Sequence, residues 1–314
     1  MWMKAALVVM AYALWCQIRR RWRRMLEEKE VVLVTGCDSG FGLAIVKALL
    51  KHTKVSVIAG AVTKQGLKGL EELGSRVKAV EMDVTKDEHV DKVFKDLEAS
   101  GKPLVGVVNN AGIGVYGWAE ALPFQRYEAN LQVNLLGVIR VTKKALPFLR
   151  KSRGRLVTMG SLGCRCPSAF GSAYIPTKAA VASFQDCVRQ EVYRFGIRCS
   201  LVEPGFFATG MLHRAAEIGK EACGTANGGE DPAILAAYGS YAEKMKTTEV
   251  PVQNVEKLNG GEQGIEWVTG AVLDALTTVL PRTRYLCGYD ANLLGRLGYF
   301  IPDFAWDLIQ TYLV

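Results

Sequence analysis

The chain has 314 residues, of which 49% are hydrophobic, so it can bury the core of one large α/β domain or of two small ones. Its formal charge of +8 could suggest a nucleic-acid-binding protein. However, six of the 39 basic residues lie within the first 24 positions, which contain no acidic residue, so the rest of the chain is near +2. We therefore predict no nucleic-acid partner.

Residues 1–24 combine an apolar run, Ala5 to Ile18, with a cluster of arginines that follows it. As a helix, residues 2–18, in which Lys4 is the one charge, would span roughly 26 Å. This length is short for a bilayer core of about 30 Å and suits the thinner endoplasmic reticulum membrane. A cleaved signal peptide is the alternative, but its charges should precede the apolar run. An interfacial hairpin or monotopic helix would have similar residues.

We therefore predict a retained anchor with a basic flank over residues 1–24 and a location in the endoplasmic reticulum membrane. The arginines follow the apolar run, and the positive-inside rule then favours a catalytic domain in the cytosol.

Strand-like and helical stretches alternate through residues 30–290, and no linker or repeat divides them. This alternation predicts a single doubly wound α/β domain, a Rossmann-like parallel sheet of about seven strands with helices on both faces. The expected strands are 31–34, 55–58, 77–80, 104–108, 156–159 and 198–202. The expected helices lie near 43–50, 67–73 and 88–97, around Asn134, after Tyr174 and over 264–280.

Two segments depart from this alternation. Residues 206–261 lack strand periodicity and are expected to form a substrate-selecting insertion above the sheet. The apolar tail, 291–314, is interrupted by Arg296, Gly298 and Pro302, which makes it unsuited to span a membrane. An amphipathic flap on the membrane surface explains the tail better, and packing against the body is the alternative.

A glycine-rich turn directly after the first strand of the body predicts a dinucleotide site. Gly36, Gly40 and Gly42 allow unusual dihedrals and a close approach of phosphates to the start of the next helix, where free N–H groups point outward. Ser39 lies in the same turn and is a further candidate for cofactor contact. Phe41 is as much a candidate for packing as for contact.

The type of dinucleotide is inferred from charge. An NAD site commonly has a carboxylate after the second strand, but residues 59–62 contain none. Asp38 would repel the additional phosphate of NADP, and Lys64 is the remaining cation that could bind it. We therefore prefer NAD over NADP as the cofactor.

Further candidates for cofactor binding follow the third and fourth strands. Asp83, which precedes Val84, could accept a hydrogen bond from the adenine amino group or could cap the next turn. The sequence Asn109-Asn-Ala-Gly112 ends the fourth strand. Its small residues, Gly112 among them, would let a cofactor approach, and Asn110 could tie adjacent loops together.

Tyr174 and Lys178 suggest acid/base chemistry. Residues four apart lie on one face of a helix, so the Lys178 ammonium could lower the pKa of the Tyr174 phenol from its usual value near 10. Ser161 precedes the pair by thirteen positions. Pro176 is best tolerated in the first turn of a helix and therefore predicts that the helix begins here.

The eight cysteines have no paired spacing, and only three histidines could complete a metal site, so we expect buried thiols and no metal.

Together, these motifs resemble the short-chain dehydrogenase/reductase family in type and order. The turn at 35–42, Glu203-Pro-Gly205 and the sequence from Arg284 to Ala291 are similar to the membrane-bound branch that contains retinol dehydrogenases and 17β- and 3α-hydroxysteroid dehydrogenases. A 3-hydroxybutyrate dehydrogenase of that branch shares the turn.

The resemblance implies a role for each matching residue. Tyr174 would be the acid/base, Lys178 would lower its pKa and hold the nicotinamide ribose, and Ser161 would bind the substrate oxygen. Asn134 would organise a water in a proton relay. Cofactor contacts would come from the remaining matched positions, Pro204, Gly205 and Thr209.

The sequence thus predicts hydride transfer between nicotinamide and a lipophilic alcohol or carbonyl such as a steroid or retinoid. A small hydroxy acid is the second substrate class, and few cations stand near the loops to bind its carboxylate. A membrane-bound nucleotide-binding scaffold without turnover and a nucleotide-sugar epimerase also stay open, and a homodimer is compatible with each of these hypotheses. Candidates for the substrate wall are Tyr116, Trp118, Phe170, Phe207, Met211 and Leu212.

Overall fold

The computed structural model describes residues 17–207, 261–298, 300–302 and 304–308, together with the single positions 10, 14, 15, 233, 236, 237 and 259. The expected anchor before residue 17, most of the 206–261 insertion and the end of the tail lie outside the described residues. Thr209, Met211 and Leu212 are among them.

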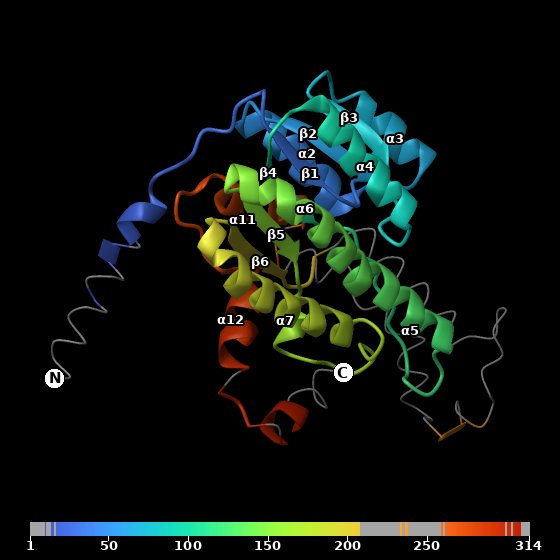
Figure 1. Cartoon of the computed structure of the whole chain (residues 1–314). Helices are drawn as coiled ribbons and strands as arrows, with labels where there is room; N and C mark the ends of the chain where they lie inside the picture. The colour runs from blue at the N-terminus through green and yellow to red at the C-terminus, as the bar shows by residue number, and fades with distance from the viewer. Residues whose placement is uncertain are drawn as a thin grey trace.

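The centre of the molecule is a parallel sheet in the order β3-β2-β1-β4-β5-β6-β7 (Figure 1). The strands are β1 (Val31–Val34), β2 (Ser56–Ala61), β3 (Val77–Glu81), β4 (Leu104–Asn109), β5 (Arg155–Met159), β6 (Arg198–Pro204) and β7 (Arg284–Cys287). The prediction of a seven-stranded doubly wound sheet is therefore confirmed. The first six strands lie where the sequence placed them, within a few residues.

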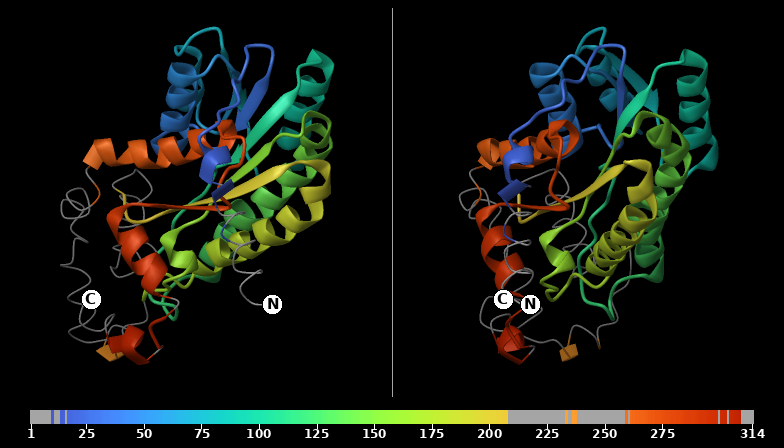
Figure 2. Two further views of the ribbon diagram at one scale, coloured as in Figure 1. Left: turned by 90° about the vertical axis from the view of Figure 1, so that its left-hand side faces the viewer. Right: turned by 60° about the vertical axis from the view of Figure 1, so that its left-hand side comes forward.

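Helices cover both faces of the sheet (Figure 2). One layer contains α2 (Gly40–His52), α3 (Lys64–Glu71) and α11 (Gly261–Thr277). The other contains α4 (Asp87–Ser100), α6 (Val138–Ser152) and α7 (Ile175–Val192). The remaining elements are α5 (Phe124–Asn130), the π-helix η1 (Leu131–Gly137), the 3-10 turns η2 (Leu162–Cys164) and η3 (Tyr193–Phe195), and α12 (Tyr289–Leu297).

The apolar first strand shows why the sheet is covered on both sides. Val32 and Val34 pack into the core beneath α2 and α11, whereas Val31 and Leu33 pack into the core beneath α4 and α6. All four side chains are at most 3% exposed. A continuous apolar run is typical of a strand whose two faces are both buried, because successive side chains alternate between the faces.

The strand order reverses between β1 and β4. From β1 the chain winds outward to β2 and β3, and it then returns to β4 on the other side of β1. In folds of this type, a reversal of strand order marks the crevice in which ligands bind, outside the carboxyl ends of these two strands. Every candidate site residue within the described part of the chain lies in a loop or helix start at this end of the sheet, or on η1 beside it.

The arginines of the amino-terminal flank contact the body as well as solvent. Arg23 forms an antiparallel bridge with Thr278, and its Nη1 lies 2.6 Å from the Asp274 carboxylate on α11. The Arg24 side chain forms an ion pair with Glu30 at 2.5 Å. The sequence pattern indicates a membrane flank for the whole cluster, and for Arg23 and Arg24 this interpretation is incomplete, because carboxylates of the domain bind them.

Within the described part of the chain, no helix is both long enough and apolar enough to cross a membrane.

The described part of the tail packs against the body on one side only. The Trp306 ring packs beside Leu162 and Cys166, and its indole N–H donates to the Pro167 carbonyl at 3.0 Å. Phe300 and Phe304 point away and are 85% and 71% exposed. The two hypotheses for the tail are therefore not exclusive, since one face packs and the other remains open.

Candidate active site

The glycines of the turn after β1 are required by close backbone contacts. Gly36 has φ of +68°, and a Cβ there would lie 2.6 Å from the Ala111 Cα. A Cβ at Gly42 would lie 2.1 Å from the Gly36 carbonyl oxygen. Gly40 has φ of +57° and opens α2, preceded by Ser39 in extended conformation. The turn thus presents bare backbone and a helix N-terminus to the crevice, which fits a dinucleotide phosphate.

The loops after β1 and β4 are held together by hydrogen bonds. The Asn110 amide donates to the Thr35 and Gly36 carbonyls, each at 2.9 Å. The Thr35 hydroxyl accepts from the backbone N–H groups of Asn110 and Ala111, at 3.1 and 3.0 Å. In this structure Asn110 therefore ties the adjacent loops together, which is the structural role that the sequence allows for it.

Asp38 brings a carboxylate to the end of β2, where the sequence indicates no acid. Its Oδ1 accepts from the Thr63 N–H and hydroxyl, both at 2.7 Å, and from the Val62 N–H at 3.1 Å. The acidic group at this position thus comes from the glycine turn and crosses over to β2. From the sequence we infer only that Asp38 would repel a phosphate. Its contact with residues 62–63 could not be predicted, because it forms only when the glycine turn folds against the end of β2.

The Asp83 carboxylate caps a turn. Its Oδ1 accepts from the Thr85 N–H and hydroxyl at 2.9 and 2.7 Å, which is the capping role considered as the alternative to adenine binding. Val84 is 5% exposed and packs closely on Gly137, where a Cβ would lie 2.6 Å from its Cγ2. Lys64, the cation considered for a phosphate, is exposed at the start of α3.

Ser161 and Tyr174 are placed by the ends of two elements. Ser161 caps η2 just after β5, and its hydroxyl accepts from the Gly163 N–H at 3.1 Å. Tyr174 is the residue before α7, and Pro176 occupies the first turn, as predicted. The Tyr174 side chain is 7% exposed and forms a hydrogen bond with Ser161.

Asn134 lies on the π-helix η1 and is fully buried. Its Oδ1 accepts from the Ile113 N–H at 2.8 Å, and its Nδ2 donates to the Ile113 carbonyl at 2.9 Å and to the Thr177 hydroxyl at 3.1 Å. A Cβ at Gly112 would lie 3.2 Å from the Asn134 Oδ1 and 3.5 Å from the Lys178 Nζ. Asn134, Gly112 and Lys178 therefore meet at one point, and a π-helix often marks a functional position.

Burial dominates the electrostatics of the Tyr174–Lys178 pair. Burial raises the pKa of Tyr174 above its usual value, and the hydrogen bond with Ser161 offsets this only in part. Burial also lowers the pKa of Lys178 to about 8. The Lys178 Nζ lies 5.8 Å from the centre of the Tyr174 ring and donates to the Met159 carbonyl at 2.9 Å.

The prediction that Lys178 lowers the pKa of Tyr174 is wrong for the free site. The helical spacing is present, since the Lys178 N–H donates to the Tyr174 carbonyl. However, desolvation penalises the phenolate and the ammonium alike, and a backbone carbonyl binds the ammonium.

One aromatic ring packs directly on Tyr174, and two further aromatic pairs include candidate wall residues. The Tyr116 and Tyr174 rings lie 5.3 Å apart, and Trp118 and Phe170 form an edge contact at 4.4 Å. Phe207 packs on Phe41 at 5.6 Å, so both of these rings serve at least a packing role. Tyr116 is thus brought against the candidate acid/base, Trp118 and Phe170 contact each other, and Phe207 lies beside the glycine turn.

Pro204 ends β6, and Gly205 follows it against α12. A Cβ at Gly205 would lie 2.0 Å from the Asp290 carboxylate, which also accepts from the Phe206 N–H at 2.7 Å. This contact orients the chain as it enters the insertion, where the described residues stop short of Thr209.

The comparisons with known proteins agree with this geometry. Residues 30–218 match the family model for short chain dehydrogenase. The chain is 35% identical to bovine (Bos taurus) 17-beta-hydroxysteroid dehydrogenase type 6, with 99% of this chain and 97% of the relative covered. It is 34% identical to human (Homo sapiens) retinol dehydrogenase 16 over the same shares of each chain. It is 37% identical to bovine mitochondrial D-beta-hydroxybutyrate dehydrogenase, over 82% of this chain and 76% of the relative.

A solved short-chain dehydrogenase from Streptomyces avermitilis superposes with a TM-score of 0.67 at 32% identity, covering 86% of this chain and 93% of that one. The chain therefore belongs to the short-chain dehydrogenase/reductase family, in the branch of the retinol and hydroxysteroid dehydrogenases. Members of this family are oxidoreductases that use nicotinamide cofactors.

Gly42→Ala should distort the turn, because the new methyl group would meet the Gly36 carbonyl oxygen. We expect at least a tenfold loss of NAD affinity by titration calorimetry, which corresponds to about 1.4 kcal/mol. Gly69→Ala is the matched control, since nothing lies within 4 Å of its Cβ position in α3. Unchanged NAD binding in Gly42→Ala would contradict the assignment of this turn to the cofactor.

Lys178→Met should change how stability depends on pH. The native state releases the Lys178 proton at a pKa of about 8, whereas the unfolded chain holds it up to about 10.5. Wild type should therefore gain stability relative to the variant as pH rises from about 8 to 10.5, by about 1.4 kcal/mol per pH unit at most. Urea unfolding of both proteins at pH 7 and pH 10 measures this, and a difference in unfolding free energy that does not vary with pH would contradict it.

Proposed function

We propose that this protein is an NAD-dependent alcohol dehydrogenase that oxidises or forms a lipophilic alcohol at Tyr174. The observation that carries the proposal is the meeting of four side chains, Asn134, Ser161, Tyr174 and Lys178, at the carboxyl ends of β4 and β5, beside the glycine turn. Tyr174 and Lys178 come from the start of α7, Ser161 from the cap of η2 and Asn134 from η1. Their convergence on one buried point is what an acid/base site requires.

A bound nicotinamide dinucleotide would supply the hydride acceptor or donor. Tyr174 is the proposed acid/base, which takes the proton of the alcohol hydroxyl or returns one to the carbonyl oxygen. Ser161 already forms a hydrogen bond with Tyr174, and its hydroxyl can donate to the same substrate oxygen as charge develops there. Asn134 and Lys178 bring their polar groups together beside Gly112, and Asn134 would position a water of the proton relay there.

The preference for NAD is supported by Asp38. Its carboxylate lies at the end of β2, where the adenosine ribose binds in this type of fold. A second phosphate on that ribose would meet a fixed negative charge. Lys64 is the cation that a preference for NADP would require.

A lipophilic substrate is supported by the Tyr116 ring that packs on Tyr174 and by the Trp118–Phe170 pair among the candidate wall residues. The similarity to enzymes named for hydroxysteroids and retinol favours a steroid or retinoid alcohol. The relative named for D-beta-hydroxybutyrate supports a small hydroxy acid as the second candidate. That substrate would need a cation for its carboxylate.

We propose that residues 1–24 hold the enzyme at the endoplasmic reticulum membrane with the catalytic domain in the cytosol. The apolar run and the arginines after it support this placement. Protease treatment of sealed microsomes tests it, because a cytosolic domain is digested and a lumenal one survives.

Tyr174→Phe tests the chemistry. In membranes supplied with NAD and a panel of retinols, hydroxysteroids and 3-hydroxybutyrate, wild type should produce NADH with at least one lipophilic alcohol. The variant should lose about 10²- to 10⁴-fold in kcat while retaining NAD affinity within a few fold, because a general acid/base contributes on that order. NAD binding without turnover on any alcohol would favour a scaffold, and turnover of 3-hydroxybutyrate alone would favour the hydroxy acid.

Asp38→Asn tests the cofactor preference. The amide oxygen can still accept from Thr63 and Val62, so the loop should keep its shape while the charge is lost. The ratio of kcat/KM for NAD to that for NADP should fall about tenfold, on the scale of a single close charge repulsion. An unchanged ratio would show that Asp38 does not face the adenosine ribose.

A further inference from the structure

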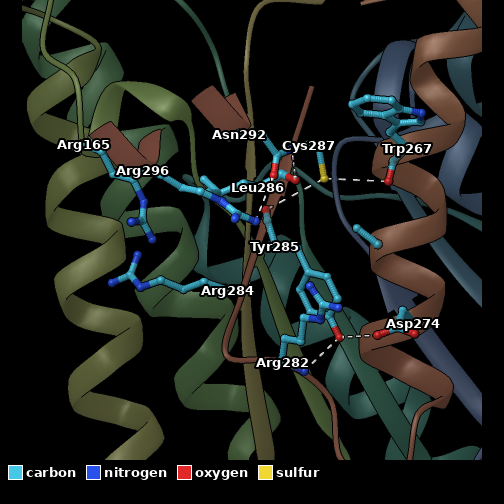
Figure 3. Close-up of a pocket in the computed structure, with 11 residues that line it drawn as sticks. Arg165, Trp267, Asp274, Arg282, Arg284, Tyr285, Leu286, Cys287, Asn292 and Arg296 are labelled. Carbon is cyan, nitrogen blue, oxygen red and sulfur yellow. Dashed lines mark hydrogen bonds between the residues drawn. The ribbon is translucent and has the colours of Figure 1, made fainter. Parts of the chain in front are cut away.

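A second cavity lies outside the proposed active site, along the free edge of β7. It has a volume of about 400 Å³ and is bounded by β7, α11 and α12. Figure 3 shows it astride the strand, with Arg165 and Arg284 on one side and Trp267, Tyr285 and Asp274 on the other. Its walls include four arginines, Arg165, Arg282, Arg284 and Arg296, and a single carboxylate, that of Asp274.

Two of these arginines, Arg165 and Arg284, form ion pairs with carboxylates that do not line the cavity. The Glu203 carboxylate is fully buried and accepts from Arg165 Nη2 at 2.9 Å and from Arg284 Nη1 at 2.9 Å. Arg284 also pairs with Asp186. These two arginines therefore build a rigid wall and leave little net charge in the cavity.

The other two arginines are not neutralised within the described part of the chain. Arg282 and Arg296 are exposed, and no carboxylate among the described residues forms an ion pair with either. Among the described residues, the hydrogen bond of the Arg296 side chain is to the Asn292 amide oxygen, at 3.5 Å. The Asp274 carboxylate forms an ion pair with Arg23 at 2.6 Å, so its charge does not neutralise Arg282 or Arg296. The cavity thus presents two free guanidinium groups, whose planar donor sets suit a phosphate.

An exposed apolar rim adjoins the cavity. Trp267 lines it and packs on Tyr289, with ring centres 4.8 Å apart. From Tyr289 the rim continues at helical spacing along α12, which ends at Leu297, and the tail beyond it exposes further apolar groups. The side chains that form the rim in these two segments are 45–85% exposed. These are Tyr289, Leu293, Leu297, Phe300, Phe304 and Leu308. Figure 2 shows α12 and the tail at the lower side of the molecule, away from α4.

We propose that this cavity binds the phosphate of an anionic phospholipid headgroup while the apolar rim enters the membrane interface. Aromatic and leucine side chains beside arginines are the composition of a surface that lies on an anionic bilayer. The amino-terminal flank reaches the domain at the same place, because Arg23 pairs with Asp274 in the cavity wall. The predicted anchor and the cavity would therefore face one membrane.

Two different occupants fit the observations less well. A second copy of the chain paired about a two-fold axis through this patch would bring its own Arg282 and Arg296 into the same interface, which would then hold four such cations. A soluble phosphate would match the charge but would leave the apolar rim in water. The lipid proposal rests on the membrane location proposed above, although its test needs neither NAD nor an alcohol.

The test uses the full chain in micelles of a neutral detergent, titrated with phosphatidylserine, with phosphatidylcholine of the same acyl chains, or with inorganic phosphate. Thermal midpoint and amide hydrogen exchange over residues 284–297 are followed. Phosphatidylserine should raise the thermal midpoint and slow the amide exchange at a lower concentration than phosphatidylcholine or inorganic phosphate does. The reason is that a ligand that binds the native state stabilises it.

Arg282→Gln combined with Arg296→Gln should weaken the apparent phosphatidylserine affinity about 25-fold, at roughly fivefold for each charge. Both side chains are exposed, so the unliganded midpoint should remain close to that of wild type. Lys92→Gln combined with Lys95→Gln removes the same charge from exposed positions on α4 and should leave the response unchanged.

Equal responses from wild type and the arginine variant would overturn the proposal. Inorganic phosphate acting as strongly as phosphatidylserine would also overturn it, in favour of a soluble anion. If wild type oxidises no alcohol of the panel but still responds to phosphatidylserine, the proposed function is rejected and this inference stands.

Discussion

Desolvation of a tyrosine and a lysine at the end of a parallel sheet is the constraint on which the rest of the site depends. Tyr174 and Lys178 are almost completely buried, and burial alone moves both pKa values toward the neutral form of each group. Such a pair is stable in the fold because carbonyls and hydroxyls bind it, the Met159 carbonyl at Lys178 and the Ser161 hydroxyl at Tyr174. Burial therefore favours the protonated phenol in the free protein.

The sheet supplies the place where a cofactor can bind. Because the strand order reverses beside β1, the carboxyl ends of β1 and β4 mark the place where folds of this type bind a dinucleotide. Asn110 fixes the two loops together, and Asn134 fixes Ile113 to α7 through Thr177. The fold thus holds the proposed acid/base and the proposed cofactor cradle in one rigid frame. Along the chain, the 206–261 insertion follows β6 and the last part of the tail follows α12.

Much of this arrangement could be predicted from the sequence, since periodicity, glycine spacing and the Pro176 helix start are local signals. Three features could not. Asp38 reaches residues 62–63 only because two loops fold together, Arg23 finds Asp274 some 250 positions away, and burial at Tyr174 outweighs the helical spacing to Lys178. Each depends on contacts between distant segments or on the degree of burial, which no local pattern encodes.

The pKa of the Tyr174 phenol, followed by NMR in the full chain with ring-labelled tyrosine, tests the central claim most directly. Tyr174→Phe identifies the resonance. The account predicts that the phenol titrates above its usual value of 10 in the free protein and that saturating oxidised NAD, whose nicotinamide ring is cationic, lowers this pKa. A phenol that titrates normally in the free protein, or one whose pKa does not respond to NAD, would contradict it.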